Sequence, residues 1–253
     1  MRLGLALSGG VVRGLAHVGV LKALEEAGFR PDCIAGTSSG ALIGALYAAG
    51  LTISELEKLA HRARWRDLAR LTVPRRGLID ISRISQLLDR IVGHLDFSQL
   101  QTQLAVVACD ITTGEEVVIT SGDVAVAVQA SCAIPGIFAP VRVGRRLLVD
   151  GGIVHNVPAA VCRRLGAQAV VAVDLSAFIP ATKEPATIFE IILNSLHIIM
   201  DKHGERESSE ADVVIRPPVA DLSPIDLDSH DELIARGYRA ALRALPAIQS
   251  LLE

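Results

Sequence analysis

Short apolar runs separated by longer mixed segments set the hydrophobic pattern of this chain. Five runs have the length and composition of buried strands: 2–8, 31–36, 104–109, 146–149 and 168–174. Residues 13–27 and 39–49 instead carry apolar side chains at helical spacing, and a glycine follows each, Gly28 or Gly50. Strands that alternate with helices predict an α/β fold, a three-layer α/β/α sandwich with a mostly parallel central sheet.

Residues 52–100 interrupt this alternation. Two polar segments with helical periodicity, 53–71 and 81–95, flank the turn-forming sequence VPRRG. A chain of 253 residues that is 50% hydrophobic has enough apolar side chains for one large core. We therefore interpret the stretch at about 52–100 as a helical insertion in a single domain that spans residues 1–253.

Beyond residue 100 the pattern predicts one hairpin and two more helices. The apolar sequences QLAVVACD and EVVIT flank the turn sequence TTGE, which indicates an antiparallel pair of strands. Helical spacing returns near 187–203 and again at 229–247, where a closing helix is expected.

The net charge and the cysteine pattern indicate which partners, location and metal sites to expect. The formal net charge of -3 gives no general attraction to nucleic acid, so we expect no nucleic-acid partner. The cysteines have no paired spacing and lie in apolar runs, which favours buried free thiols, an intracellular location and no zinc site. They are Cys33, Cys109, Cys132 and Cys162.

The hydrophobic runs also bear on location. The N-terminal run is too short for a signal peptide, and no run approaches the roughly 18 residues that a membrane span needs. We expect a cytoplasmic protein and leave open peripheral contact with the inner membrane face.

The first sequence with chemical meaning is GTSSG, which lies between a predicted strand and a predicted helix. In the pattern Gly36-x-Ser38-x-Gly40, small neighbours let strand and helix come close, as in the sharp turn that carries a nucleophilic serine. Ser38 would lie at the positive end of the helix. An ordinary turn with a capping serine fits the same five residues, so other motifs must decide.

A second glycine-rich turn, SGGVVRG at 8–14, ends the first predicted strand. Backbone N–H groups at such a turn suit either a phosphate or the oxyanion of an acyl-transfer intermediate. The spacing lacks the Lys-Ser/Thr pair of a P-loop and the Gly-x-Gly-x-x-Gly of a dinucleotide site. An oxyanion hole is the remaining interpretation.

A nucleophilic serine needs a base, and three aspartates end apolar runs. Asp110 and Asp174 precede ordinary strand exits, where aspartate is a common turn residue. Asp150 is followed by Gly151 and Gly152, which permit a close approach to another loop, so it is our candidate base.

A Ser-Asp-His triad is the alternative. Four histidines follow the candidate base in the right order: His155, His197, His203 and His230. Only one strand–helix unit precedes Ser38, however, whereas α/β-hydrolases have several strands before the nucleophile. No histidine lies in a recognisable motif.

Four ordered motifs resemble those of bacterial patatin-like phospholipases: LALSGGVVRGLAHVGVLKALEEAG, GTSSGALIGALYAAG, ASCAIPGIFAPV and LLVDGGIVHNVP. The resemblance is good over residues 1–50 and 105–175 and loose elsewhere. It implies an acyl hydrolase with a Ser-Asp dyad and no metal or cofactor, acting on a lipid or another acyl ester.

The resemblance also implies roles for individual residues. Ser38 is the expected nucleophile and Asp150 its base. The expected oxyanion hole comprises Gly9, Gly10, Val11, Arg13 and Gly14. The supporting glycines are Gly36, Gly40, Gly151 and Gly152.

One position departs from the family pattern, because the family has a further glycine where this chain has Val11. Valine disfavours a positive φ. Either the loop keeps a negative φ at this residue or the oxyanion hole is altered.

Substrate and surface contacts stay open at this level. A soluble carboxylesterase or thioesterase, or a catalytically weak scaffold that keeps the fold, are alternatives to a lipid hydrolase. The segment Arg62–Arg76 holds six arginines and Trp65. It fits either a solvated helix face or a basic surface that contacts anionic lipid.

Overall fold

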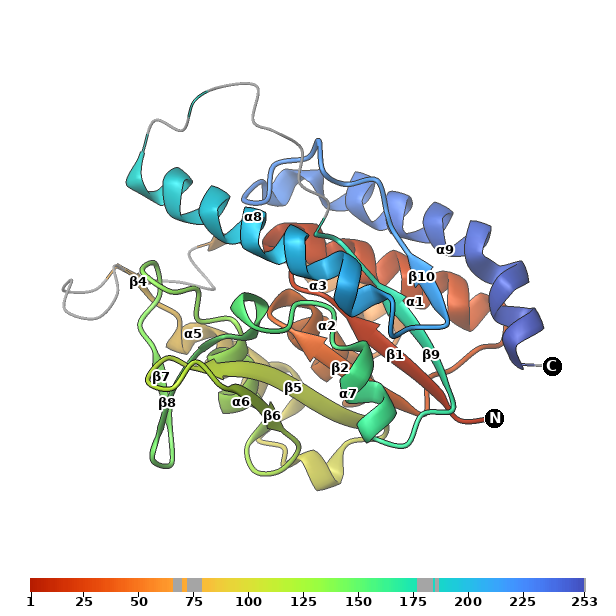
Figure 1. Ribbon diagram of the computed structural model, residues 1–253, viewed down its shortest axis with the longest axis horizontal. Coiled ribbons are helices and arrows are strands. Elements are labelled where there is room, and N and C mark those ends of the chain that lie inside the picture. Colours follow the sequence, from red (N-terminus) through yellow and green to blue (C-terminus); the bar gives the residue numbers. More distant parts are fainter. Residues whose placement is uncertain (66–69, 72–78, 177–183, 185–186, 253) are drawn as a thin grey trace.

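A computed structural model describes residues 1–65, 70–71, 79–176, 184 and 187–252 (Figure 1). Its central sheet has the strand order β10-β9-β1-β2-β5-β8-β7, and β6 also pairs with β5. The strands are β1 Leu3–Leu7, β2 Cys33–Thr37, β5 Gln103–Asp110, β6 Glu116–Ile119, β7 Val141–Val143, β8 Arg146–Asp150, β9 Ala169–Val173 and β10 Val213–Ile215.

The sheet is mostly parallel, as predicted. Strands β10, β9, β1, β2 and β5 run parallel to their neighbours, whereas β6, β7 and β8 are antiparallel additions. All five apolar runs expected to be strands are strands, and the expected hairpin is β5–β6. Strands β7 and β10 were not predicted, because three residues are too few for a periodic pattern.

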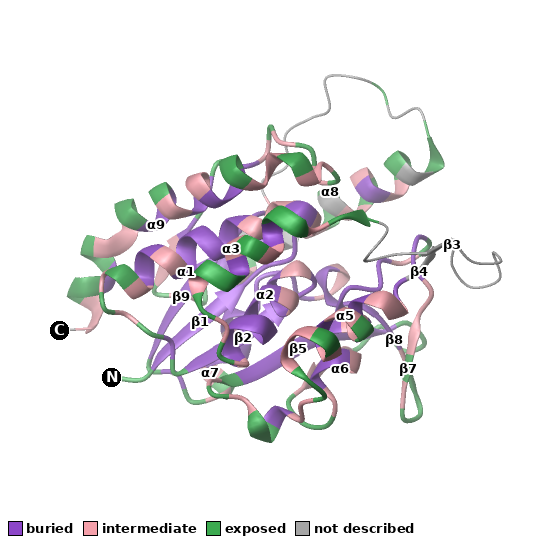
Figure 2. Ribbon diagram, turned by 180° about the vertical axis from the view of Figure 1, so that it is seen from behind, coloured by how far each residue is buried: buried purple, intermediate pink, exposed green. Residues whose placement is uncertain are grey.

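Helices cover both faces of the sheet (Figures 1 and 2). They are α1 Ala16–Glu26, α2 Ser39–Ala48, α3 Ile53–Arg62, α5 Ser82–Val92, α6 Val124–Ser131, α7 Ala159–Arg164, α8 Ile188–Ser208 and α9 His230–Leu252. Short 3₁₀ helices are η1 Val11–Leu15, η2 Phe97–Gln99, η3 Gly151–Ile153 and η4 Leu227–Ser229. Helix α9 packs along α1 and closes one face, as expected.

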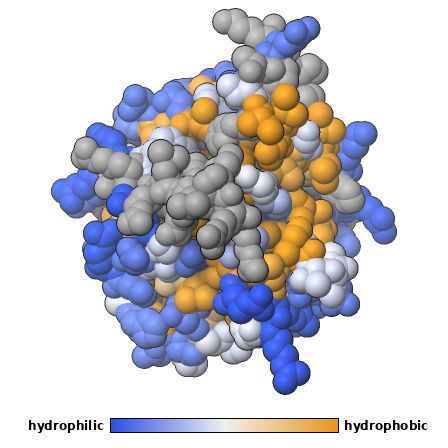
Figure 3. Space-filling view, turned by 90° about the vertical axis from the view of Figure 1, so that its left-hand side faces the viewer, coloured by the Kyte–Doolittle hydropathy of each residue, from blue (hydrophilic) through white to orange (hydrophobic). Residues whose placement is uncertain are grey.

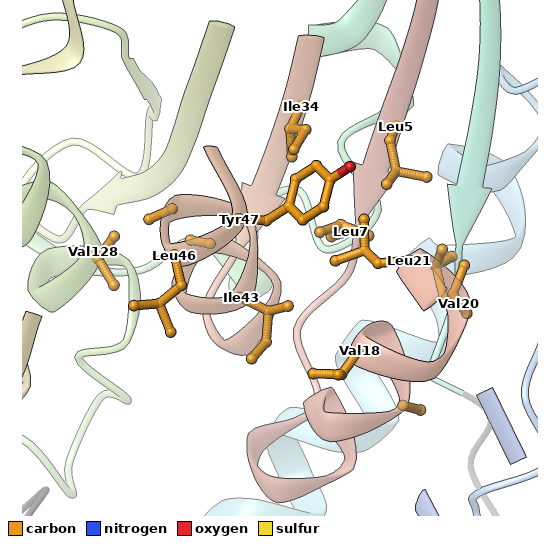
Figure 4. Close-up of a cluster of buried hydrophobic side chains, with 14 of the residues drawn as sticks. Leu5, Leu7, Val18, Val20, Leu21, Ile34, Ile43, Leu46, Tyr47 and Val128 are labelled. Carbon is orange, nitrogen blue, oxygen red and sulfur yellow. The ribbon is translucent and has the colours of Figure 1, made fainter. Parts of the chain in front are cut away.

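The two faces of the sheet bury different side chains. Large residues such as Leu5, Leu7 and Ile34 point toward α1 and α2, where Figure 4 shows them packed against Leu21 and Ile43. The alternating positions are mainly alanine, cysteine and valine, and they pack against α7. Small side chains let α7 approach the sheet closely, which completes the three layers.

The predicted helix at 53–71 is confirmed over Ile53–Arg62 and is wrong at residues 63–64 and 70–71. Helix α3 begins with a capping box between Thr52 and Glu55 and ends at Arg62, because the backbone of Ala63 turns extended. A short strand β3, Arg70–Leu71, then pairs with β4, Ile79–Asp80. The rest of the predicted basic run, 66–69 and 72–78, lies outside the described residues.

Among the described residues, no helix is both long enough and apolar enough to cross a bilayer.

Candidate active site

Ser38 occupies a sharp turn between β2 and α2. Its φ of 53° lies in the left-handed region that non-glycine residues rarely adopt. The turn is tight because a Cβ at Gly40 would lie 2.2 Å from the Leu7 carbonyl oxygen, and a Cβ at Gly36 would lie 2.6 Å from the Ala41 Cα. Glycine is therefore required on both sides of Ser38 for α2 to approach β1 and β2.

Ser131, at the end of α6, ties this turn to the sheet. The Ser38 N–H donates to the Ser131 Oγ at 2.8 Å, and the same hydroxyl donates to the Val107 carbonyl at 2.6 Å. Sequence reasoning did not single out Ser131, although it lies in the motif ASCAIPGIFAPV. Its two hydrogen bonds satisfy buried groups of the turn and the sheet, so the strained backbone of Ser38 is held in place.

Strand register brings Asp150 to Ser38. Strand β2 ends with Thr37 paired to Val107 of β5, and β8 ends with Asp150 paired to Ala108, the next residue of β5. Strand β6 pairs with one edge of β5, because it contacts residues 106–109 there. The other edge of β5 pairs with β2 up to residue 107 and with β8 from residue 108 onward. The two strands consequently meet end to end.

Asp150 is buried, with 4% of its surface exposed. Its Oδ1 accepts the Gly152 N–H at 2.8 Å. Burial raises the pKa of Asp150 to about 6, against the opposing effect of hydrogen bonds from the Ser38 side chain and the Gly152 N–H. At neutral pH this carboxyl is thus ionised and more basic than an ordinary aspartate.

Cys132 lies beside Ser38 and is a second potential nucleophile. Burial and the negative charge of Asp150 raise the pKa of the Cys132 thiol well above its usual range. The thiol stays protonated at neutral pH and is a weak nucleophile. All four cysteines are buried and free, as predicted.

The histidines whose side chains are described are engaged elsewhere. The Nδ1 of His155 lies 3.0 Å from Glu116 Oε2. Burial lowers the pKa of His155, but Glu116 and the charge of Glu207 outweigh this and raise it. His230 packs edge-on against His61 at 4.3 Å.

His17 is hydrogen-bonded to the start of the glycine-rich turn. Its Nε2 donates to the Ser8 carbonyl at 2.8 Å, and burial lowers its pKa to about 4, so the ring is neutral. The side chains of His197 and His203 lie outside the described residues.

The expected oxyanion residues have different environments. The Gly9 N–H donates to Asn156 Oδ1 at 3.1 Å, so it is already engaged. The guanidinium of Arg13 donates to the carbonyls of Ala220 and Leu222, which anchors the loop. A Cβ at Gly14 would lie 2.4 Å from the Ser39 side chain, so Gly14 allows contact with α2.

Gly10 and Val11 remain as candidate donors. Neither of their N–H groups finds a hydrogen-bond acceptor in the part of the chain that the structure describes. Both residues line a cavity of about 20 Å³ together with Ser38 and Asp150. Their amides are therefore placed where an oxyanion formed at Ser38 could be bound.

Val11 resolves one of the open alternatives. Its φ is 52°, which excludes the alternative of a negative φ at this residue. A β-branched residue in this region carries strain of about 1–3 kcal/mol. The loop keeps the backbone shape of a glycine although valine occupies the position.

A large apolar cavity of about 360 Å³ opens from the other side of Ser38. Its walls come from α2, α3 and α5, and they include Leu42, Leu46, Leu56 and Leu88. Helix α8 covers the small cavity on the opposite side, through residues that include Met200. Ser38 is only 5% exposed, and it lines both of these cavities.

Residues with metal-ligand spacing occur away from this centre. Within the described ranges, two clusters of histidine and aspartate bring such atoms together, and neither includes Ser38 or Asp150. The Ser38 centre thus offers a serine, a carboxylate and backbone amides as its chemical groups.

Comparison with known proteins identifies the family. Residues 5–163 match the family described as patatin-like phospholipase. The chain belongs to the patatin-like phospholipase family. An NTE family protein of Mycobacterium tuberculosis is 39% identical over 181 residues, which cover 69% of this chain and 49% of that protein.

More distant similarities extend over nearly the whole chain. Lysophospholipase NTE1 of Pyricularia oryzae is 25% identical over 278 residues, which cover 98% of this chain and 18% of that protein. VipD from Legionella pneumophila shares the patatin-like fold, with a TM-score of 0.69 at 15% identity, over 97% of this chain and 66% of that chain. The chain spans about half the length of the Mycobacterium tuberculosis protein and about a fifth of the length of lysophospholipase NTE1.

The strain at Val11 leads to a stability prediction. In Val11→Gly, relief of about 1–3 kcal/mol of strain offsets the lost burial and the greater unfolded-state entropy of glycine. We expect the free energy of unfolding, measured by urea denaturation, to change by less than about 1 kcal/mol.

Val12 provides the matched control, because it is buried next to Val11 and has no positive φ. Val12→Gly should lower the free energy of unfolding by about 2 kcal/mol or more, from lost burial and added unfolded-state entropy. Equal losses in the two variants would show that Val11 carries no strain.

Proposed function

We propose that this chain is a serine acyl hydrolase that cleaves fatty-acyl ester bonds of lipids through a Ser38–Asp150 dyad. The observation that carries the proposal is the buried Asp150, with a pKa near 6, which lines the same small cavity as a serine held at a positive φ. Ser38 also lies where an apolar cavity meets two unengaged backbone amides. The proposed base, the proposed oxyanion donors and the nucleophile thus line one small cavity.

The reaction follows from this arrangement. Ser38 Oγ attacks the ester carbonyl carbon while Asp150 accepts the hydroxyl proton, and the Gly10 and Val11 N–H groups bind the developing oxyanion. When the tetrahedral intermediate collapses, the C–O bond breaks and protonated Asp150 gives its proton to the leaving alcohol. Asp150 then takes a proton from water as the water oxygen attacks the acyl-enzyme carbonyl. The bond between the acyl carbon and Ser38 Oγ breaks, the fatty acid leaves, and Asp150 returns the proton to Ser38 Oγ.

The cavity favours a long acyl chain over a short soluble one. A space of about 360 Å³ is within the range of ligand sites, and its walls beside Ser38 are largely leucine and isoleucine. Burial of each methylene contributes about 0.8 kcal/mol, so the cavity selects for chain length. A curated relative named as a lysophospholipase supports a lipid substrate.

Labelling by a fluorophosphonate tests the nucleophile and its base together. We expect one label per chain, on Ser38, with a rate that follows ionisation of Asp150. Because Asp150 accepts protons only when ionised, and its pKa is about 6, labelling at pH 8 should be about tenfold faster than at pH 5.

The control for this experiment is Ser38→Ala, which should not be labelled. Undiminished labelling of Ser38→Ala would disprove the assignment of the nucleophile. A rate that is constant between pH 5 and pH 8 would remove Asp150 as its base.

We also propose peripheral contact with an anionic membrane through Arg62–Arg76 and the outer face of α8. On α8, the exposed Ile188, Ile191 and Ile198 recur at helical spacing, while Met200 lines the small cavity at Ser38. Figure 3 shows apolar surface on the side of the molecule where α8 begins. A lipid bound to this face would lie close to the nucleophile.

The described residues at the start of the segment Arg62–Arg76 lie at the large apolar cavity. Arg62, Arg64 and Trp65 line the large apolar space, and Trp65 is 37% exposed. Its indole N–H donates to the Ile225 carbonyl at 2.8 Å, so one edge of the ring is fixed to the protein. The basic segment therefore adjoins the large cavity at Ser38, and α8 adjoins the small one.

Vesicle binding tests the α8 surface. Replacing Ile188, Ile191 and Ile198 together by Gln should lower the partition coefficient onto vesicles of an anionic phospholipid by at least about tenfold, because apolar insertion is lost. Cosedimentation measures the coefficient.

The control uses two exposed apolar residues elsewhere. Ile111 and Leu242 lie outside α8 and are 45% and 43% exposed, close to Ile191 and Ile198, and their replacement by Gln should leave vesicle binding unchanged. Equal binding by the native protein and the α8 variant would refute contact through this helix.

A further inference from the structure

Three side chains from distant parts of the sequence converge between α3 and α9. His61 lies near the end of α3, and His230 and Asp231 begin α9. One ligand atom from each lies within 4.8 Å of the others. The His61 Nε2 is 3.4 Å from Asp231 Oδ1, and the His230 Nε2 is 3.8 Å from Asp231 Oδ2.

The hydrogen bond of His230 fixes which ring nitrogen is free. Its Nδ1 lies 2.9 Å from the Leu227 carbonyl oxygen, which can only accept, so Nδ1 carries the proton. The lone pair is then on Nε2, which lies on the Asp231 side. A backbone carbonyl that orients an imidazole in this way is the usual outer partner of a metal-binding histidine.

We propose that His61, His230 and Asp231 bind one divalent transition-metal ion, with Zn²⁺ as the probe. Ligand atoms of a tetrahedral zinc site lie about 3.3 Å apart, since Zn–N and Zn–O bonds are about 2.0–2.2 Å. The 3.4 Å separation of His61 and Asp231 already fits, and small side-chain rotations bring the third ligand in. Water completes the fourth position, because His61 and Asp231 are exposed.

The local charge suits a cation. The positive end of the α9 dipole opposes metal binding, but Asp228 just before α9 and Asp231 in its first turn supply negative charge. Two imidazoles and one carboxylate are a ligand set that favours zinc over calcium or magnesium. The cysteine pattern could not predict this site, because its ligands are not cysteines and His61 is 169 positions from His230.

The ion would connect two walls of the apolar cavity. Helix α3 contributes Leu56 and Leu59, and the segment before α9 contributes Leu227, whose carbonyl fixes His230. Trp65 lines the same cavity and is already bonded to Ile225 of that segment. Metal binding therefore links the end of α3 to residues 225–231 beside the entrance used in the proposed reaction.

A second cluster serves as the comparison. Asp89, His94 and Asp123 also bring three ligand atoms together, but only one is an imidazole. Asp123 in addition accepts the Val126 N–H as the N-cap of α6. Transition metals favour the site with two histidines.

Calorimetric titration of chelator-treated protein with ZnCl₂ tests the site. We expect one Zn²⁺ per chain, and His61→Ala and Asp231→Asn should each weaken binding by at least about tenfold. Asp231→Asn removes a ligand charge from an exposed side chain, so folding is preserved. His94→Ala, the control from the second cluster, should bind Zn²⁺ as the native protein does.

Two results would overturn the proposal. One is the absence of binding at zinc concentrations up to about 1 mM, which is weaker than any functional transition-metal site. The other is binding that survives both His61→Ala and Asp231→Asn, or that is lost in His94→Ala. Neither result bears on hydrolysis by Ser38, so the metal site and the proposed reaction fail separately.

Trp65 reports the link to the cavity, because it is the only tryptophan in the chain. Zn²⁺ should change its emission with the same midpoint as the calorimetric titration, and Asp231→Asn should abolish that change at the same zinc concentrations. Binding without any emission change would contradict the connection between the ion and the cavity wall.

Discussion

The site depends on the close approach of α2 to the ends of β1 and β2. Gly36 and Gly40 allow contact distances that no side chain would permit, and Ser38 between them adopts a positive φ as a consequence. The hydroxyl of Ser131 holds this turn against the sheet. If α2 were displaced by the width of one methyl group, Ser38 would leave both the glycine-rich loop and the aspartate.

The same sheet that forces this turn also positions the proposed base. Strand β8 is antiparallel to β5 and follows β2 along one edge, so its last residue, Asp150, arrives at the end of β2. Burial then makes the carboxylate more basic than usual. His155, only five residues later, is directed toward Glu116 instead, which leaves the aspartate as the described base nearest the serine. In the proposed dyad, topology and burial together take over the role that a histidine has in a triad.

Much of this architecture could be predicted because short sequence patterns determine it. The buried strands, the helices around Ser38 and the position of Asp150 before two glycines all depend on neighbours within a few residues. The Val11 backbone could not be predicted, because valine by itself disfavours the φ that the loop imposes.

Hydrogen bonds between residues far apart in the sequence could not be predicted either. Asn156 accepts the Gly9 N–H across 147 positions, and Ser131 meets Ser38 across 93. The end of α3 at Arg62 was missed because a run of arginines is as compatible with a helix as with an extended chain. Such features follow from tertiary contacts, which override the preferences of single residues.

The account is tested most directly by comparing kcat of Ser38→Ala, Asp150→Asn and the double variant on a long-chain acyl ester. An amide preserves the shape of Asp150 but cannot accept the serine proton, so both single variants should lose activity to the same extent, by at least about 10²- to 10⁴-fold. The double variant should be no worse than either, because the two residues act as a unit. His155→Gln should keep kcat within about tenfold of the native value. A folded His155→Gln as inactive as Ser38→Ala, or an Asp150→Asn that keeps most of its activity, would contradict the dyad.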